Sequence, residues 1–402
     1  MMSSYVPGSI AALALVAALS VVAAPAAIAE KVSSAVGKPF MEAQRAVQAG
    51  NMDEALQSLA KARAASKTTF EKLQVSEMFA FIYARQRNYG AAADAYETSL
   101  SLSPTQGRSQ RLNTICQMRY QARTMEKALA ACGRVARENP TGATYGLLAS
   151  MYRQQRQYAA SNNAVQSALR AGGAGSTEAL LQMQYANYAA LRDAAGQRRA
   201  LEALIANKPS RDNWERLQAL VEQKLPPKPR MDLDMDRIRL VTGVTAKAEQ
   251  YMLMAQLSLE AGLPGEAVSV LAKGSAAKLL GSGVEKARQD RLIAKAKADA
   301  AADQAALPAF DKEAQTATDG KKELLLGQRY VSYAKFSDGI AAIKRGIGKG
   351  GFDAGEGQLR LGQALYAAGR RAEAQRAFDA VPAGNPYAAV ANLWSIHART
   401  SG

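Results

Sequence analysis

The sequence predicts an all-α fold, in which antiparallel helix pairs repeat along the chain in two arrays separated by a proline-rich joint. Three observations predict it. The chain is self-similar with a period of about 34 residues, the length of a helix–turn–helix repeat. Small residues recur at fixed places in each period, where two helices can approach closely. Finally, 48% of the 402 residues are hydrophobic, which is enough to bury a substantial core.

Residues 1–29 have the features of a signal peptide. An apolar run from Ile10 to Ala24 is followed by Pro25 and then by Ala27-Ile28-Ala29, the small-x-small pattern after which signal peptidase cleaves. We therefore expect cleavage after Ala29, and a mature periplasmic chain that is not an integral membrane protein. The alternative is a retained N-terminal membrane anchor, because Ile10 to Ala29 is long enough to span a bilayer.

Residues 30–224 are expected to form the first array. Apolar or small side chains occupy the positions where the two helices of a repeat meet. One period later the equivalent positions again hold apolar or small side chains, except that Arg119 replaces a tyrosine. Two successive copies hold Phe79, Ala80, Tyr83, Ala92 and Tyr96, and then Ile115, Cys116, Arg119, Ala128 and Cys132. The segments Gly50-Asn51 and Asn88-Tyr89-Gly90 are placed to turn the chain between helices.

Residues 225–243 are expected to form a stiff joint with a short irregular segment, because Pro226-Pro227-Lys228-Pro229 cannot be helical. Asp232, Asp234 and Asp236 then open like a calcium loop. However, Arg237 and Gly243 stand where an EF-hand needs a glycine and a bidentate glutamate. We therefore interpret these residues as a solvated acidic edge. The second array follows at 244–402, and its repeats are anchored by Gly262, Leu271, Gly327, Leu361, Gly362 and Phe378.

This pattern resembles the tetratricopeptide repeat family over most of the predicted mature chain. The resemblance implies a right-handed superhelical solenoid, with the first helix of each pair lining the concave surface. Exported proteobacterial repeat proteins of unassigned role provide a narrower resemblance. It covers three stretches of the second half, which run from Trp214 to Gly243, from Gly262 to Ala267 and from Ala389 to Trp394.

The resemblance also implies a partner-binding groove on the first helices of the N-terminal array. The family's inward positions correspond here to Arg85, Asn113, Gln117, Tyr120, Gln121, Arg153 and Gln154. These polar and planar side chains are suited to an extended peptide backbone. The family's charged clamp for peptide carboxylates, with its paired Lys and Asn, is not reproduced at these positions.

Cys116 and Cys132 are the only thiols, and the repeat pattern places them on facing helices of one pair. Export to an oxidising compartment favours a disulfide between them. The alternative is two small buried core residues, because the sequence does not say whether their Cα atoms come within the 7 Å that a bridge requires.

The chain is strongly basic, with a formal net charge of +16. The excess is concentrated from Arg108 to Arg170, where Glu126 and Glu138 are the only acidic residues and nearly all of the basic ones are arginine. One interpretation is a solvated basic face. The other is a surface that binds an acidic polysaccharide or a peptidoglycan-associated polymer, since arginine grips carboxylates and phosphates bidentately. Nucleic acid is a poor candidate, because aromatic side chains for base stacking are few.

Catalysis is not indicated. A single histidine, His397, and two cysteines cannot supply the four nitrogen and sulfur ligands of a structural zinc site. The glycines from Gly346 to Gly351 match a dinucleotide fingerprint, but a helical pattern precedes them where a strand is needed, so we interpret them as an inter-repeat turn. The sequence thus predicts no enzyme, no metal and no cofactor. It predicts a periplasmic scaffold for a protein or peptide partner, with the acidic polymer as the alternative ligand.

Overall fold

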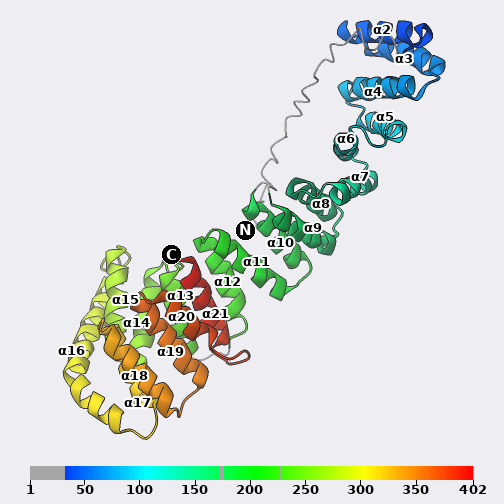
Figure 1. Ribbon diagram of the computed structural model, residues 1–402. Coiled ribbons are helices and arrows are strands. Elements are labelled where there is room, and N and C mark those ends of the chain that lie inside the picture. The colour runs from blue at the N-terminus through cyan, green and yellow to red at the C-terminus, as the bar shows by residue number, and fades with distance from the viewer. Residues whose placement is uncertain (1–31, 173–175, 226–228, 402) are drawn as a thin grey trace. The chain divides into compact units, whose positions relative to one another are not determined.

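The computed structural model describes residues 32–172, 176–225 and 229–401, and all regular structure in these ranges is helical (Figure 1). The described residues belong to two compact units. Unit 1 lies within residues 1–155 and 170–174, and unit 2 within 156–169 and 175–402. Within the described ranges, no helix is both long and apolar enough to cross a bilayer. The predicted signal peptide, residues 1–29, lies outside the described residues.

Unit 1 is built from consecutive antiparallel pairs: α2 with α3, α4 with α5, and α6 with α7. Small residues at the predicted contact positions allow the two helices of a pair to pack closely, and Ala80, Ala92, Ala128 and Cys132 are completely buried. The helices are α2 (Ser34–Gln48), α3 (Met52–Ala65), α4 (Thr69–Arg85), α5 (Tyr89–Leu102), α6 (Arg108–Gln121), α7 (Met125–Glu138) and α8 (Gly142–Gln154).

Arg119, the departure from the repeat pattern, is also buried. Its side chain is 3% exposed, and its guanidinium pairs with Asp94 at 2.5 Å and with Glu97 at 3.1 Å, both from α5 of the preceding pair. An arginine fits a core position here because its stem fills the apolar space while its charged head reaches two carboxylates. At this position an ion pair with α5 therefore replaces the contact that a tyrosine makes in the preceding repeat.

The start of α4 is fixed by Glu71. Its carboxylate accepts hydrogen bonds from the backbone N–H and hydroxyl of Ser33, at 2.9 and 2.7 Å, and from the N–H groups of Lys67 and Thr68. The Thr68 hydroxyl in turn accepts from the N–H of Glu71, which completes a capping box. These donors, that of the Ser33 backbone first, hold the pKa of Glu71 well below its usual value and tie α2 to α4.

The turns inside the pairs differ from the prediction at one point. Gly50 has the left-handed backbone expected of a turn glycine, with φ of 84°. Gly90, however, lies inside α5, and the left-handed residue of that turn is Arg87. Arg123 takes the same conformation between α6 and α7. An arginine there carries a conformational cost of about 1 kcal/mol that glycine does not, and it leaves an exposed cation at the turn.

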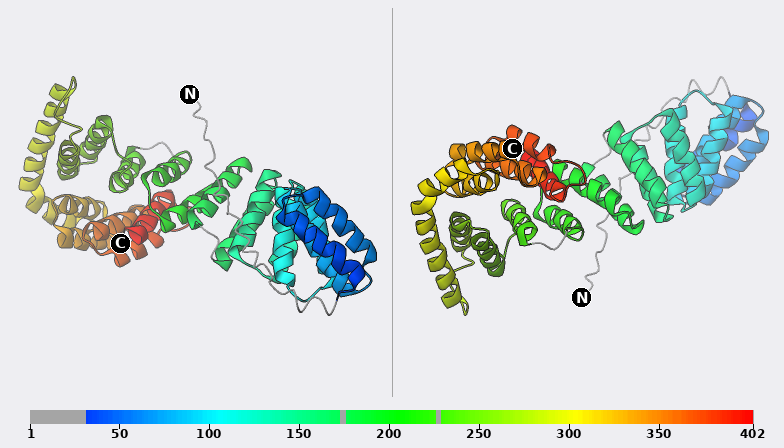
Figure 2. Two further views of the ribbon diagram at one scale, coloured as in Figure 1. Left: turned by 90° about the horizontal axis from the view of Figure 1, so that it is seen from above. Right: turned by 90° about the horizontal axis from the view of Figure 1, so that it is seen from below.

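Unit 2 contains the remaining helices, except for the last two residues of α9. They are α9 (Tyr158–Ala171), α10 (Thr177–Ala190), α11 (Ala194–Asn207), α12 (Arg211–Glu222), α13 (Pro229–Val241), α14 (Ala248–Glu260), α15 (Pro264–Ala276), α16 (Lys286–Thr316), α17 (Lys321–Ser332), α18 (Phe336–Lys349), α19 (Ala354–Ala367), α20 (Arg371–Asp379) and α21 (Ala388–Thr400). The long α16 lies at one end of the unit, and the chain turns back there so that α15 contacts α17 (Figure 2). Helices α13 to α15 therefore face helices α17 to α19.

The predicted joint is wrong in its second half. Helix α13 begins at Pro229, which is tolerated in a first helical turn because its missing N–H would have no partner there. The helix is not irregular, and its apolar side chains Leu233, Met235 and Ile238 are buried. The predicted solvated edge is wrong as well, since Asp234 is completely buried and Asp236 is 8% exposed. Residues 226–228 lie outside the described residues.

The predicted boundary between the arrays, at 224, is also corrected. Helices α10 to α12 share one apolar core with the C-terminal helices, in which Leu201 and Trp214 lie in the same cluster as Phe378 and Trp394. Helix α21 closes this core, because it contacts α11, α12 and α13, and Asn392 on α21 donates to Glu202 on α11 at 3.1 Å. In the described chain the division falls near residues 155–175 instead.

Close helix contact in unit 2 depends on glycine where the sequence predicted it. A Cβ added to Gly362 on α19 would lie 2.3 Å from the ring of Phe378 on α20. No larger side chain fits without moving that ring, so Gly362 sets the spacing between these two helices.

Candidate functional site

The predicted groove residues of unit 1 lie on the first helices of successive pairs. Arg85 ends α4, the set from Asn113 to Gln121 lies on α6, and Arg153 and Gln154 end α8. Two side-chain contacts join successive first helices. Gln154 donates to the hydroxyl of Tyr120 at 3.0 Å, 34 residues away, and Arg111 pairs with Glu77 at 2.7 Å, also 34 residues away. Side chains of α4 and α6, and of α6 and α8, therefore touch.

Most of these side chains remain available to a partner. Arg85, Gln117, Gln121, Arg153 and Gln154 are exposed. Asn113 and Tyr120 are half-buried. The Arg85 guanidinium lies over the ring of Phe81, 4.9 Å from its centroid, which holds an otherwise flexible cation against the helix. The structure thus brings Tyr120 and Gln154 into contact. The other predicted groove residues form no hydrogen bonds with one another in the described part of the chain.

The arginine-rich stretch divides into paired and unpaired residues. Arg108 pairs with Glu138 at 2.6 Å, Arg111 with Glu77, and Arg119 with two carboxylates. Arg123 and Arg153 are exposed and form no ion pair with any described residue. Part of the predicted positive surface is therefore neutralised by acidic residues, three of which, Glu77, Asp94 and Glu97, lie before the stretch in the sequence.

Cys116 on α6 and Cys132 on α7 are joined by a disulfide, with their Cα atoms 4.7 Å apart. This distance falls inside the range that a bridge spans without moving the backbone. Both residues are buried at the contact between the two helices. The bridge therefore fixes the pair that carries Asn113, Gln117, Tyr120 and Gln121.

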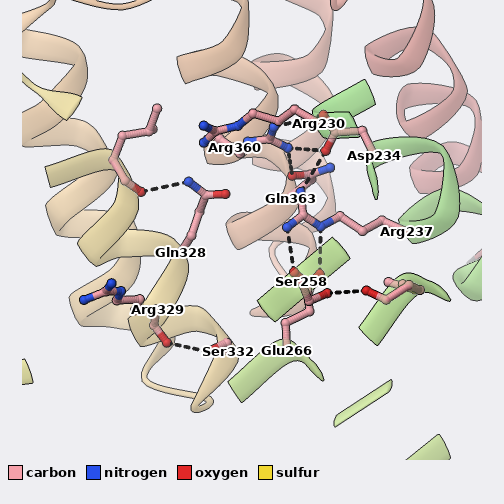
Figure 3. Close-up of polar contacts among 12 residues, drawn as sticks. Arg230, Asp234, Arg237, Ser258, Glu266, Gln328, Arg329, Ser332, Arg360 and Gln363 are labelled. Atoms are coloured by element: carbon pink, nitrogen blue, oxygen red, sulfur yellow. Dashed lines mark hydrogen bonds and ion pairs between the residues drawn. The ribbon is translucent and has the colours of Figure 1, made fainter. Parts of the chain in front are cut away.

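A buried ionic network in unit 2 was missed by the sequence analysis (Figure 3). Asp234 accepts from both terminal nitrogens of Arg360 and from Arg237 at 2.8 Å, and Arg237 forms two further hydrogen bonds, of 2.7 and 2.6 Å, to the carboxylate of Glu266. The network joins α13, α15 and α19. No local pattern could reveal it, because Asp234 and Arg360 are 126 residues apart in the sequence.

The charged groups of this network keep one another ionised. Burial alone would raise the pKa of the Asp234 carboxyl, but the guanidiniums of Arg360 and Arg237 outweigh it and hold that pKa below its usual value. Burial likewise opposes the charge of Arg237, yet Glu266 and Asp234 raise the pKa of Arg237 above its usual value. Asp234 and Arg237 are therefore both ionised at neutral pH.

His397 is packed in the core of unit 2. It lies beside Trp214, with ring centroids 5.7 Å apart, and its Nε2 is 2.9 Å from the hydroxyl of Tyr366. Burial, with a smaller contribution from the positive charge of Arg371, lowers the pKa of His397 to about 4. The imidazole is therefore neutral in the folded protein at neutral pH.

This lowered pKa predicts a specific acid sensitivity. The unfolded chain binds a proton to His397 near pH 6.5 and the folded chain only near pH 4, so acid favours the unfolded state between these values. We expect the free energy of unfolding of unit 2 to fall by about 2 kcal/mol between about pH 7.5 and about pH 4.5 through this residue. Denaturant unfolding of the full chain and of His397→Gln at both pH values measures it. An equal acid loss in the variant would contradict the assignment.

The two glycine- and aspartate-containing motifs do not form ligand loops. Asp232 to Asp236 lie on α13, and Gly346 and Gly348 lie on the last turns of α18, which extends to Lys349. The predicted inter-repeat turn thus begins only at Gly350. Gly346 packs closely against the backbone of Gly320, because a Cβ on Gly346 would lie 2.9 Å from the Gly320 carbonyl oxygen. In the described ranges, no three His, Cys, Asp or Glu residues are grouped so that they could hold a metal ion.

The chain is similar to several solved structures. A tetratricopeptide repeat protein from Parabacteroides merdae ATCC 43184 is 16% identical, over 66% of this chain and 100% of that chain, with a TM-score of 0.33. MamA from residue 41 onward, from Desulfovibrio magneticus RS-1, is 18% identical over 44% and 99% of the two chains, with a TM-score of 0.30. The structure of Naa15/Naa10 bound to HypK-THB is 12% identical over 90% and 60%, with a TM-score of 0.32.

No protein-family profile matches the chain, and no curated protein matches it either. Two features of its helices show what the chain shares with tetratricopeptide repeat proteins. The described helices pair consecutively, and side chains on successive first helices meet at a spacing of 34 residues. The resemblance that the sequence predicted is therefore one of architecture.

Proposed function

We propose that this chain is a non-catalytic scaffold of the bacterial cell envelope that binds a protein or peptide partner along the first-helix face of unit 1. The contact between Tyr120 and Gln154 carries the proposal, because it joins two first helices into one surface with exposed planar polar groups on either side. Such groups can hydrogen-bond an extended backbone. Tyrosine and arginine, which dominate binding energy in many interfaces, are both present on it.

An envelope location is supported by two separate features. The small-x-small pattern of Ala27-Ile28-Ala29 follows an apolar run, as at signal-peptidase sites. The disulfide between Cys116 and Cys132 is of a kind that persists in the periplasm and is rare in the cytosol.

A second candidate function is the binding of an acidic envelope polymer. It is favoured by the exposed Arg123 and Arg153, which have no acidic partner in the described part of unit 1. It is weakened by the pairing of Arg108, Arg111 and Arg119. Salt separates the two candidates, because binding to a polyanion weakens steeply as ionic strength rises and a peptide groove is much less sensitive.

Replacement of groove residues is expected to weaken partner binding. The partner is first captured on the full chain from envelope extract, identified and purified, and its Kd is then measured for each variant. We expect Tyr120→Ala and Arg153→Ala each to cost about 1 kcal/mol or more, which is a Kd increase of about fivefold or more. Circular dichroism should show unchanged helical content.

The matched control for this experiment is Arg137→Ala. Arg137 is exposed like Arg153, but it lies on α7, a second helix. Arg345 would be a poor control, because it forms hydrogen bonds of 3.0 and 2.9 Å to the buried carboxylate of Glu323. If Arg137→Ala weakens binding while the two groove variants bind as the unchanged chain does, the proposed face is wrong.

A further inference from the structure

A cavity of about 470 Å³ lies inside unit 2, between helices α13 to α15 on one side and α17 to α19 with α21 on the other. It arises because the chain turns back at α16 and the two sets of helices face each other (Figure 2). Its walls are mainly apolar, and they include Leu240, Val241, Met254, Leu263, Val270, Val331, Phe336 and Ile343. The walls therefore suit a ligand with an apolar body.

Three residues that line the cavity each carry a buried hydrogen-bond donor that has no acceptor among the described residues. They are Nε of Arg360, Nε2 of Gln363 and Nε1 of Trp394. Arg360 is 1% exposed and Trp394 4% exposed. The Gln363 amide is oriented by the network in Figure 3, because its Oε1 accepts from Arg360 at 3.0 Å and so its NH₂ group is the end left over. A buried donor without a partner costs about 1–3 kcal/mol, so a ligand gains stability if its binding lets an acceptor reach one of these donors.

The charge of the wall specifies one negative charge on the ligand. Arg237, Lys273 and Arg360 line the cavity against the single carboxylate of Glu266. Asp234, behind the wall, neutralises one further cation through its ion pairs with Arg237 and Arg360. Glu356, 3.6 Å from Arg360, is balanced by its own pair with Arg230 at 2.9 Å. One positive charge is left over, and exposed Lys273 on α15 supplies it.

We propose that this cavity binds a small apolar monocarboxylate. The carboxylate matches the charge excess, and its two oxygens can accept from several donors at once. At about 30 Å³ for each water-sized group, the volume holds about 15 non-hydrogen atoms, which is a fatty acid of medium chain length and not a peptide segment of several residues. The site belongs to unit 2, so the test of this proposal is independent of the test of the groove in unit 1.

The test uses the full chain and titrates it with hexanoate, decanoate, tetradecanoate and decanol. Calorimetry on the unchanged chain gives affinity and stoichiometry. In Trp214→Phe, Trp394 is the only tryptophan, so its fluorescence reports on the cavity wall. We expect saturable binding of one decanoate for each chain, with a change in Trp394 fluorescence. Decanol should bind at least about tenfold more weakly, because it leaves the positive charge unmatched.

A pair of matched variants locates the site. Ser269→Phe places a ring at the cavity wall on α15 and should weaken decanoate binding at least about tenfold. Ala272→Phe adds the same ring to an exposed position of the same helix outside the wall and should leave the Kd unchanged. The proposal is overturned if no acid binds saturably, if decanol binds as tightly as decanoate, or if both phenylalanine variants weaken binding alike.

Discussion

Asp234→Asn is expected to lower the free energy of unfolding of unit 2 by about 3 kcal/mol or more. The substitution keeps the shape of the side chain but removes its charge. Arg360, which is 1% exposed, then loses the carboxylate that holds it with two hydrogen bonds, and Arg237 loses one of its two acidic partners. Breaking a buried pair costs far more than an exposed pair contributes, because the remaining charge is left without compensation.

Denaturant unfolding of the full chain, followed by circular dichroism, measures this loss. Glu222→Gln is the matched control, since it removes the charge from a more exposed ion pair, with Arg239 at 2.5 Å. It should cost about 1 kcal/mol or less. Equal effects of the two substitutions would show that the Asp234 network contributes no more than a surface pair does.

Cys132→Ala is expected to destabilise unit 1 by about 3 kcal/mol, the contribution that the chain-entropy model gives for a loop of this size. The bridge to Cys116 closes a separation of 16 residues between α6 and α7. Because α6 carries Tyr120, local opening of this pair should also weaken partner binding. Thermal unfolding of the oxidised protein and of the variant, with the transition of unit 1 identified by hydrogen exchange, measures the effect.

Thiol chemistry provides the control for the cysteine substitution. Denatured protein that has not been reduced should contain no titratable thiol, and reduction should lower the stability of the unchanged chain to that of Cys132→Ala. Two titratable thiols for each chain, or a reduced protein as stable as the oxidised one, would mean that the cysteines serve only as packed core residues.

The helix pairs could be predicted because the information that specifies them is local. Small residues recur one repeat apart, as Ala80 with Cys116 and Ala92 with Ala128, and any pair of helices carrying them packs in the same way. The boundary between the units could not be predicted in this way. The prolines at 226–229 favoured a joint, but Trp214 and the buried side chains Met235 and Ile238 of α13 belong to the same apolar core as Trp394. No single segment of the sequence shows that it shares a core with segments so far away along the chain.

The same limit applies to the sites. The first-helix face follows from the repeat spacing, so Tyr120 and Gln154 could be placed on one surface before the structure was known. The cavity of unit 2 could not be inferred, because its donors lie on α19 and α21 while its acidic residues lie on α13 and α15. Asp234 in particular has an exposed neighbour, Asp232, and only the distant Arg360 shows that it is a core residue.

The closing helix α21 has a consequence for biosynthesis. Its side chains Leu393 and Trp394 complete a core that begins with α10 and α11, so unit 2 cannot bury that core until α21 has been synthesised. Unit 1 needs no such late segment, since its pairs are consecutive in the chain. Domains generally fold as units in order of synthesis, and incomplete cores expose apolar surface that aggregates. Until α21 is present, the apolar side chains of α10 to α12 that pack in this core with Leu393 and Trp394 therefore stay incompletely buried.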